Sequence, residues 1–285
     1  MIPQNFDYAT PESLEEAFRL LSDPNAKVLA GGQSLIPMMR LRLAAPETLV
    51  DLRGVPGLGG IRLEGRTLRV GAMVTHYELE SSPLVRKSCP LLAEAAANIG
   101  DVQVRNCGTI GGSLAHADPA ADYPASLHAL EASVRIASPS GERTVSIADF
   151  LVDTFTTALE PGELVVEVSV PVEAEGAGVS YQKCVQPASG FAIVGVAARI
   201  VKKDGEIAFA RIGVTGLSGN AFRATGVEKL LEGTRGDASD IGRAVAGIGD
   251  GVDANNDIHA SAAYRQHLAR VYAARAIVAA VSRAK

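Results

Sequence analysis

Tryptophan is absent from the 285-residue sequence, and cysteine occurs only three times, at Cys89, Cys107 and Cys184. These cysteines are far apart, so they form none of the paired spacings that hold a zinc ion or an iron–sulfur cluster. The spacing also offers no framework for disulfides. We therefore expect this chain itself to hold no metal ion and no disulfide bond.

The sequence also lacks an excess of positive charge and a long apolar run. It has 27 Lys and Arg residues against 32 Asp and Glu residues, a net charge of −5, and the basic residues form no stripe. This balance disfavours a nucleic-acid partner. The polar start does not resemble a signal peptide, and no segment is long and apolar enough to span a bilayer. We expect a cytoplasmic protein, and its 47% of apolar residues suffice for a substantial core.

The common nucleotide-binding fingerprints are missing as well. The glycines within residues 57–60 and 247–251 do not have the Rossmann spacing, and no Gly-Lys-Ser or Gly-Lys-Thr sequence occurs. A bound nucleotide would therefore require another architecture.

The first part of the chain mixes helical and strand patterns. Thr10 and Pro11 suit the start of a helix that has apolar residues at helical spacing through Leu21. A short strand over residues 28–30 then leads into a helix that Ser34 could cap and that runs to Leu43. Further helices are expected near residues 77–79, 91–99 and 122–130, and strands near 48–51, 61–63, 67–71, 134–137, 144–146 and 164–170. Residues 100–119 show no period.

The composition changes to small and acidic residues near positions 171–178, which indicates a domain boundary. Beyond it, an antiparallel meander is expected over residues 179–185, 192–201 and 208–217, with a tight turn at Asp204-Gly205 and helices near 225–231, 240–246 and 261–281. We thus expect an α+β protein. Its N-terminal domain would span residues 1–175, with subdomains of about 1–55 and 56–175, and its C-terminal domain residues 178–285.

Two short segments combine glycines with hydroxyl-bearing residues. They are Ala30-Gly31-Gly32-Gln33-Ser34-Leu35, here the first glycine segment, and Thr109-Ile110-Gly111-Gly112-Ser113, here the second glycine segment. Such loops let backbone N–H groups approach the oxygens of a pyrophosphate, and Thr109 and Ser113 add hydroxyls. A side chain introduced at Gly111 should then enter the pyrophosphate site. For either segment taken alone, a simple turn is the commoner explanation.

Three parts of the sequence resemble the medium, flavoprotein subunit of the carbon monoxide and xanthine dehydrogenase family. They are the start of the sequence, the stretch AGGQSLIPMM and, above all, RNCGTIGGSLAHADPAADYP at residues 105–124. The resemblance spans nearly the whole chain. It implies an FAD-binding fold like that of p-cresol methylhydroxylase, followed by a C-terminal domain with a small antiparallel sheet and helices. It also implies a complex with a small iron–sulfur subunit and a large subunit that holds the molybdenum cofactor, usually paired as a dimer of heterotrimers.

The resemblance places both glycine segments around the FAD diphosphate. It implies that Asp122 accepts a hydrogen bond from a cofactor hydroxyl, that the backbone of Val165 reaches the flavin, and that Lys183 lies near the isoalloxazine ring. A cation there would stabilise the negative charge of the reduced ring. Phe191 could stack on the flavin. From the residues alone, Asp122 could instead cap a helix, Lys183 could be a surface residue, and Phe191 could be a core aromatic.

Two positions depart from the family pattern. Gly190 stands where relatives commonly carry aspartate, and Gln33 stands where carbon monoxide dehydrogenases carry histidine, which disfavours carbon monoxide as the substrate. Near the second glycine segment, we interpret His116 as a loop-stabilising residue and Cys107 as a small packing residue. Arg105 and Asn106 could orient the segment, contact a partner chain or only make loop hydrogen bonds. We do not expect covalent attachment of a flavin.

These implications predict an FAD-binding electron-transfer subunit of a molybdenum hydroxylase. It would take electrons from iron–sulfur clusters of a partner and pass them to an external acceptor, such as oxygen, a quinone or a carrier protein. The substrate would be oxidised on another chain, so no catalytic residue is expected here. A stand-alone flavin oxidoreductase of the same fold and a scaffold protein that has lost its cofactor are the alternatives. The intact glycines argue against loss of the cofactor.

Overall fold

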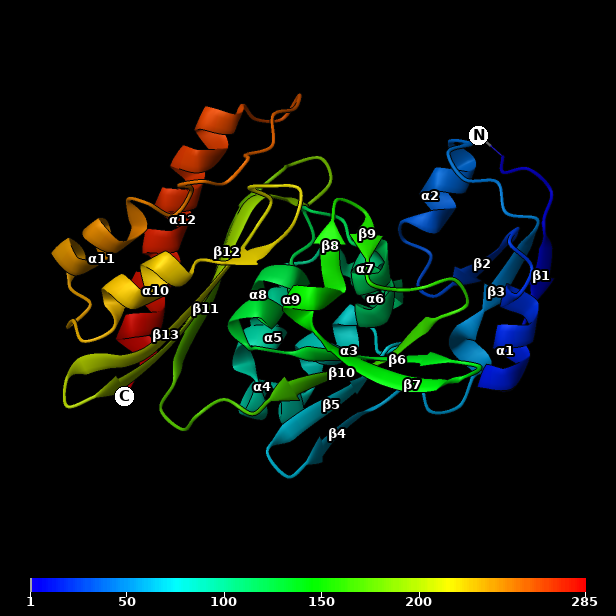
Figure 1. Cartoon of the computed structure of the whole chain (residues 1–285), viewed down its shortest axis with the longest axis horizontal. Coiled ribbons are helices and arrows are strands. Elements are labelled where there is room, and N and C mark those ends of the chain that lie inside the picture. Colours follow the sequence, from blue (N-terminus) through cyan, green and yellow to red (C-terminus); the bar gives the residue numbers. More distant parts are fainter. Residues whose placement is uncertain (1) are drawn as a thin grey trace.

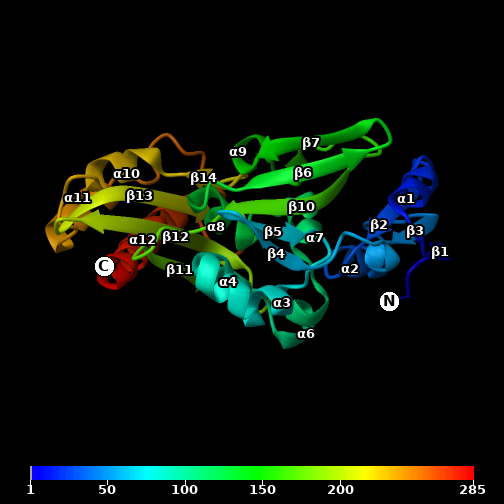
Figure 2. The same cartoon turned by 90° about the horizontal axis from the view of Figure 1, so that it is seen from below.

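The computed structural model describes residues 2–285 and contains three main β-sheets that follow one another in chain order along the long axis of the molecule (Figures 1 and 2). Helices pack on each sheet, which confirms the expected α+β class. A two-stranded ribbon of β8 (Leu151–Asp153) and β9 (Thr156–Thr157) accompanies the second sheet.

The first sheet is parallel, with the strand order β1-β3-β2. Its elements are β1 (Asp7–Ala9), α1 (Leu14–Leu21), β2 (Ala26–Leu29), α2 (Leu35–Arg40), β3 (Thr48–Asp51) and the 3-10 helix η1 (Leu52–Gly54). Helix α1 buries Ala17 and packs on β2 and β3. The first glycine segment leaves this sheet at the carboxyl end of β2 and runs directly into α2.

The predicted start of the first helix is wrong. Ser13, not Thr10, is the N-cap, because its hydroxyl accepts a hydrogen bond from the N–H of Glu16. A serine three positions before a glutamate is a known signal for a helix start, since it satisfies an N–H that would otherwise lack a partner. Pro11 precedes the helix instead of opening it.

The predicted end of the second helix is also wrong. Helix α2 ends at Arg40 and not at Leu43, because Arg42 adopts the left-handed conformation with φ of 61°. The N–H of Leu43 then donates to the carbonyl of Met38 at 2.8 Å, which closes the last turn. Ser34 occupies the predicted N-cap position, but its hydroxyl makes no capping hydrogen bond.

The second sheet is antiparallel, with the strand order β4-β5-β10-β6-β7. Its strands are β4 (Ile61–Glu64), β5 (Thr67–Gly71), β6 (Ser133–Ser138), β7 (Gly141–Ser146) and β10 (Leu164–Pro171). The predicted hairpin of β4 and β5 is confirmed, but its two turn residues are Gly65 and Arg66, one position later than expected, because Glu64 is still part of β4 and pairs with Thr67. Strand β10 comes last in the chain but lies in the middle of the sheet, and it is buried along almost its whole length.

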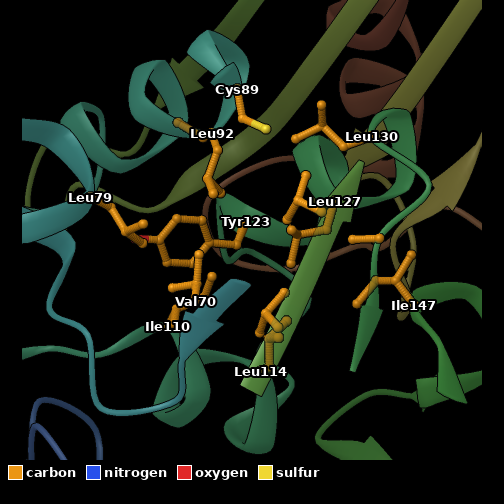
Figure 3. Close-up of a cluster of buried hydrophobic side chains, with 14 of the residues drawn as sticks. Val70, Leu79, Cys89, Leu92, Ile110, Leu114, Tyr123, Leu127, Leu130 and Ile147 are labelled. Atoms are coloured by element: carbon orange, nitrogen blue, oxygen red, sulfur yellow. The ribbon is translucent and has the colours of Figure 1, made fainter. Parts of the chain in front are cut away.

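The helices of this central part are α3 (His76–Ser81), α4 (Pro83–Ser88), α5 (Pro90–Ala97), α6 (Val102–Cys107), α7 (Ile110–His116), α8 (Tyr123–Ala129) and α9 (Ile147–Phe150). Residues 100–119, which show no sequence period, therefore contain two short helices, and α4 was not predicted either. Together with the sheet these helices form the main core. Figure 3 shows the ring of Tyr123 among the side chains of Leu79, Leu92 and Ile110.

The third sheet is antiparallel, with the strand order β11-β12-β13-β14. Its elements are β11 (Gly178–Val185), β12 (Ala192–Lys203), β13 (Glu206–Thr215), β14 (Phe222–Arg223), α10 (Thr225–Leu231), α11 (Ala238–Val245) and α12 (Ala262–Arg283). The predicted meander and its turn at Asp204-Gly205 are confirmed. The segment between Pro171 and Gly178 joins the second sheet to the third, and the domain bounds themselves stay a prediction.

Both faces of the third sheet are covered. Along β12, the even-numbered positions within 194–200 pack toward α10, α11 and α12, whereas Ala197 belongs to the core of the central part. On that second face α8 lies across β12 and β13. Gly213 makes this approach possible, because a side chain there would overlap the carbonyl of Ala125. Helix α8 thus joins the central part to the third sheet, and Asp122, directly before it, lies at the junction.

Candidate functional site

The two glycine segments are distant in sequence but lie against each other. A Cβ atom on Gly31 would stand 2.5 Å from the Cα of Gly108 and would overlap the carbonyl of Cys107. A Cβ atom on Gly112 would stand 3.4 Å from the Cβ of Ala30. Only glycine at position 31 permits this approach, since any side chain would push the backbones apart. The structure thus brings together the two segments that the sequence singled out.

The first glycine segment leaves its backbone donors free. Within residues 2–285, no N–H group of residues 31–35 donates a hydrogen bond to the protein. Gly32 has φ of 73°, a conformation that glycine adopts without strain. The side chain of Gln33 is exposed, and its Nε2 donates to the carbonyl of Gly31 at 3.2 Å. The segment therefore presents successive unpaired N–H groups, which suit an anionic ligand.

The second glycine segment uses most of its backbone donors within the protein. The N–H groups of Ile110, Gly111 and Gly112 each donate to a protein acceptor at 2.9 to 3.1 Å. The acceptors are the carbonyls of Val74 and Ala72 and the hydroxyl of Thr109, which thereby caps α7. The groups left for a ligand are the N–H of Thr109 and the hydroxyl protons of Thr109 and Ser113. The expectation that both segments offer rows of free N–H groups is therefore wrong for the second.

Gly111 points into the protein and not toward a ligand. A Cβ atom on Gly111 would stand 2.5 Å from the Cβ of Ala72, so the expectation that a side chain here enters the pyrophosphate site is wrong. Ala72 also links this segment to β10, because its N–H donates to the carbonyl of Val166 at 3.0 Å. The buried Val165 is the neighbour of that residue, at the point where β10 shifts its register against β6.

Asp122 and Lys183 form a buried ion pair. The Nζ of Lys183 lies 2.9 Å from the Oδ1 of Asp122, and each side chain is 3% exposed. The hydroxyl of Tyr181 donates to the same carboxylate at 2.5 Å. Burial raises the pKa of Asp122 to about 6, against the lowering effects of Lys183 and Tyr181. Lys183 also donates to the carbonyls of Asn98 and Gly190, each at 2.6 Å.

Three predicted site residues do not have the purely structural roles that the sequence also allowed. Asp122 stands at the N-cap position of α8, but its side chain makes no capping hydrogen bond. Lys183 is buried and is not a surface lysine. Phe191 is 40% exposed, so it is not a core aromatic. It ends the connection between β11 and β12, where its carbonyl accepts a hydrogen bond from the N–H of Gln186. Its ring is therefore open to contact with a ligand.

Two family models together cover almost the whole chain. The FAD binding domain in molybdopterin dehydrogenase matches residues 4–173, and the CO dehydrogenase flavoprotein C-terminal domain matches residues 179–280. The chain belongs to this flavoprotein family. The expected resemblance to its FAD-binding medium subunits is confirmed, and the flavoprotein is accordingly part of an oxidoreductase with FAD as its cofactor.

Individual relatives match the flavoprotein from end to end. It is 40% identical to the 6-hydroxypseudooxynicotine dehydrogenase complex subunit alpha of Paenarthrobacter nicotinovorans, over 100% of this chain and 97% of the relative. It is 38% identical to the carbon monoxide dehydrogenase medium chain of Afipia carboxidovorans, over 100% of both chains. Among solved structures, the carbon monoxide dehydrogenase of Hydrogenophaga pseudoflava matches with a TM-score of 0.97 and 41% identity, again over 100% of both chains.

The arrangement of the two glycine segments fits an FAD diphosphate. The contacts at Gly31 and Gly112 set the free N–H groups of residues 31–35 beside the second glycine segment, which carries the hydroxyls of Thr109 and Ser113. Hydroxyl and N–H donors from two sides are what the oxygens of a diphosphate require. The flavoprotein therefore has a donor set of the right chemistry for the cofactor of its family.

His76 supports the second glycine segment, and the sequence did not reveal it. Its backbone N–H donates to the carbonyl of Gly108 at 2.9 Å, and the Nδ1 of its ring lies 2.9 Å from the hydroxyl of the buried Tyr123. Burial lowers the pKa of His76 to about 4, so the ring is neutral at pH 7. The available signal was the capping box of Thr75 and Glu78, which places His76 in the first turn of α3.

Two of the three remaining candidates near the second glycine segment contact other side chains of the protein. Arg105 forms an ion pair with Glu80 at 2.8 Å, and the ring of His116 lies 5.1 Å from that of Phe155. The interpretation of Cys107 as a packing residue is wrong, since its side chain is exposed. Among residues 2–285, no group of three or more His, Cys, Asp and Glu side chains is arranged to hold a metal ion.

No helix in the described part of the flavoprotein has the length and apolar character needed to cross a membrane.

A polar pocket of about 640 Å³ lies elsewhere, between the β8–β9 turn and residues 218–222 and 252–256. None of the predicted site residues lines it. Its polar groups support the surrounding loops: the hydroxyl of Thr154 donates to the carbonyl of Gly219, and the amide of Asn220 donates to the carbonyl of Leu151. The two glycine segments, and not this pocket, therefore define the candidate site.

Proposed function

We propose that this flavoprotein is the electron-transfer subunit of a molybdenum hydroxylase complex. It takes electrons from the iron–sulfur clusters of a small partner subunit and passes them to an external acceptor, while a large subunit with the molybdenum cofactor oxidises the substrate. The proposed assembly is a dimer of heterotrimers in the cytoplasm. Support comes from relatives that match the whole chain and are named as a complex subunit or a medium chain.

The contact between the two glycine segments is the observation that carries this proposal. It sets the backbone of the first glycine segment, with the free N–H groups of residues 31–35, against the segment that carries the hydroxyls of Thr109 and Ser113. In the proposed complex with FAD, these groups donate to the diphosphate oxygens. The close-packed backbone beneath the diphosphate is then formed by Ala30, Ile110, Gly111 and Gly112.

Four residues would surround the remainder of the cofactor. We place Asp122 beside a hydroxyl of the cofactor and the backbone of Val165, the side chain of Lys183 and the exposed ring of Phe191 around the isoalloxazine. Bound FAD supplies the ability to receive electrons singly and to release them singly or in pairs. The residues of this chain hold and orient the ring, and Phe191 offers a flat apolar surface for stacking.

Substrate oxidation belongs to another chain in this proposal. The relatives and solved structures that match nearly all of this chain are named for different compounds, among them 6-hydroxypseudooxynicotine, carbon monoxide and quinoline. Their identities to this chain are 40%, 38% and 37%. A subunit that fits all three about equally well is not the part that selects the compound, which argues for a shared relay function.

The test compares the chain alone with the chain produced together with the products of its neighbouring genes. We expect the chain alone to show a flavin spectrum and no molybdenum or iron, and substrate turnover to require the partner subunits. A folded chain with neither a flavin spectrum nor affinity for added FAD would contradict the proposal. Turnover by the chain alone would favour a stand-alone flavin oxidoreductase.

A further inference from the structure

Lys183 connects three segments that are distant in sequence. Its Nζ donates to the carboxylate of Asp122 before α8, to the carbonyl of Asn98 after α5, and to the carbonyl of Gly190 between β11 and β12. All three protons of the ammonium group are therefore used inside the protein. The connection between β11 and β12, residues 186–191, is here named the hairpin loop. Lys183 ties this loop to the turn that follows α5.

Gly190 shows how closely the hairpin loop approaches that turn. Its φ is 76°, and a Cβ atom on it would stand 3.0 Å from the Cα of Gly100. Position 190 thus has no room for a side chain unless the turn moves. Within the loop, the N–H of Gly190 donates to the carbonyl of Gln186, and the N–H of Gln186 donates to the carbonyl of Phe191, both at 2.9 Å.

We propose that Lys183 is a positioning residue that latches the hairpin loop onto the turn after α5 and thereby fixes the ring of Phe191 at the flavin. The latch itself stands on the contacts within this chain, whereas its effect on the flavin rests on the proposed function. Asp122 balances the charge of Lys183 at 2.9 Å, so the two charges largely cancel at the distance of a neighbouring ring. Lys183 therefore acts on the flavin through the geometry of the loop more than through its charge.

The absence of tryptophan from this chain makes the loop directly observable. Phe191→Trp introduces a single tryptophan at the end of the hairpin loop, and its emission reports on the loop without interference. In the full-length chain without FAD, acrylamide quenching of this emission measures how exposed the side chain is. Hydrogen exchange of the amides of Gln186 and Gly190 measures opening of the loop independently. With FAD bound, a nearby indole ring quenches flavin fluorescence, so flavin emission reports on the contact.

Three variants in the Phe191→Trp background separate the latch from the charge. Lys183→Met combined with Asp122→Asn removes both members of the ion pair, so no uncompensated charge is left buried. Asp122→Asn alone leaves the charge of Lys183 unbalanced, but it keeps the two carbonyl acceptors and offers the amide oxygen of the new side chain as a third acceptor for Nζ, so it separates the charge from the latch. Lys203→Met is the matched control, since Lys203 is an exposed lysine at the end of β12.

The double variant should raise the exchange rates of the loop amides about tenfold and increase acrylamide quenching. Asp122→Asn should give a much smaller rise and Lys203→Met none. With FAD bound, the double variant should restore the flavin emission that the introduced indole ring quenches. Unchanged loop exchange in a folded double variant would overturn the latch, as would an equal rise in Asp122→Asn. Faster exchange with unchanged flavin emission would overturn the positioning of Phe191. Failure of every variant and of the parent to bind FAD would refute the proposed function, while the exchange rates would still decide the latch.

Discussion

Gly31 of the first glycine segment packs directly on the backbone of Gly108, so that a Cβ atom on Gly31 would stand 2.5 Å from the Cα of Gly108. This contact connects the parallel sheet at the N-terminus to the central part of the flavoprotein. It also sets the separation between the free N–H groups of residues 31–35 and the hydroxyl of Thr109. The geometry of the proposed diphosphate site thus depends on the absence of a side chain at Gly31.

Gly31→Ala should weaken FAD binding while leaving the chain folded. The added methyl group forces the two segments apart, which costs about 1–3 kcal/mol, and an equal loss of binding energy corresponds to a drop in affinity of roughly tenfold to a hundredfold. Titration of the FAD-free chain with FAD, followed by flavin fluorescence, measures the change. Gly59→Ala is the control, because a Cβ atom there meets nothing within 4 Å. Equal affinities in the two variants would argue against the site.

Gly111→Val should impair folding more than it impairs FAD binding. Its side chain would meet Ala72, whose N–H and carbonyl join β10 to the second glycine segment. We expect a loss of stability of about 1–3 kcal/mol or more from overpacking, seen as a lower melting temperature of the FAD-free chain. A helical glycine in open space, Gly226 in α10, provides the control variant Gly226→Ala. An unchanged melting temperature with complete loss of FAD would mean that Gly111 faces the cofactor after all.

Thr109→Val should reduce both the stability of α7 and the affinity for FAD. The variant removes the hydroxyl that accepts the N–H of Gly112 at 3.1 Å, a loss of about 1 kcal/mol for a helix cap. It also removes a hydroxyl proton that is available to the diphosphate. Thr109→Ser keeps both functions and should restore them. If Thr109→Ser binds FAD as poorly as Thr109→Val in calorimetric titration, the methyl group and not the hydroxyl is what matters.

His128 should make the flavoprotein sensitive to acid. It lies in α8, and burial lowers its pKa to about 4 from an ordinary value of 6.5. Between pH 6.5 and pH 4 the imidazole of His128 binds a proton in the unfolded chain but not in the folded chain. The folded chain therefore loses part of its free energy of unfolding as the pH falls from 7 toward 4. The full effect is about 3 kcal/mol. Urea unfolding at several pH values should show a smaller loss for His128→Leu than for the unchanged chain, and parallel profiles would contradict the assignment.

Local patterns in the sequence predicted most strands and the long helices. The signal at Glu64-Gly65 located the hairpin of β4 and β5 to within one residue, and Asp204-Gly205 located the turn in the meander of the third sheet. Both turns need backbone conformations that few residues adopt, so their signals are strong. Helices α6 and α7 were missed because each has only six or seven residues and too few apolar positions to show a period. Their caps, Asp101 and Thr109, were the usable signals.

The chemistry of the candidate site was predictable in kind but not in arrangement. Glycine and hydroxyl residues indicated an anion site, and the family resemblance identified the anion as FAD. Which backbone donors are free could not be read from the sequence, because the acceptors that occupy the second glycine segment come from Ala72 and Val74, more than thirty positions away. For the same reason the pairing of Asp122, directly before α8, with Lys183 in β11 could not be read from the sequence.

The central claim is that FAD binds where the two glycine segments meet, and hydrogen exchange of the purified full-length chain with and without FAD tests it most directly. The N–H groups of residues 31–35 lack acceptors in the chain, so they should exchange rapidly without FAD. Added FAD should bind once per chain and slow exchange at these amides and at the N–H of Thr109. Binding of FAD that leaves these amides as fast as before, with protection elsewhere in the chain, would contradict the account.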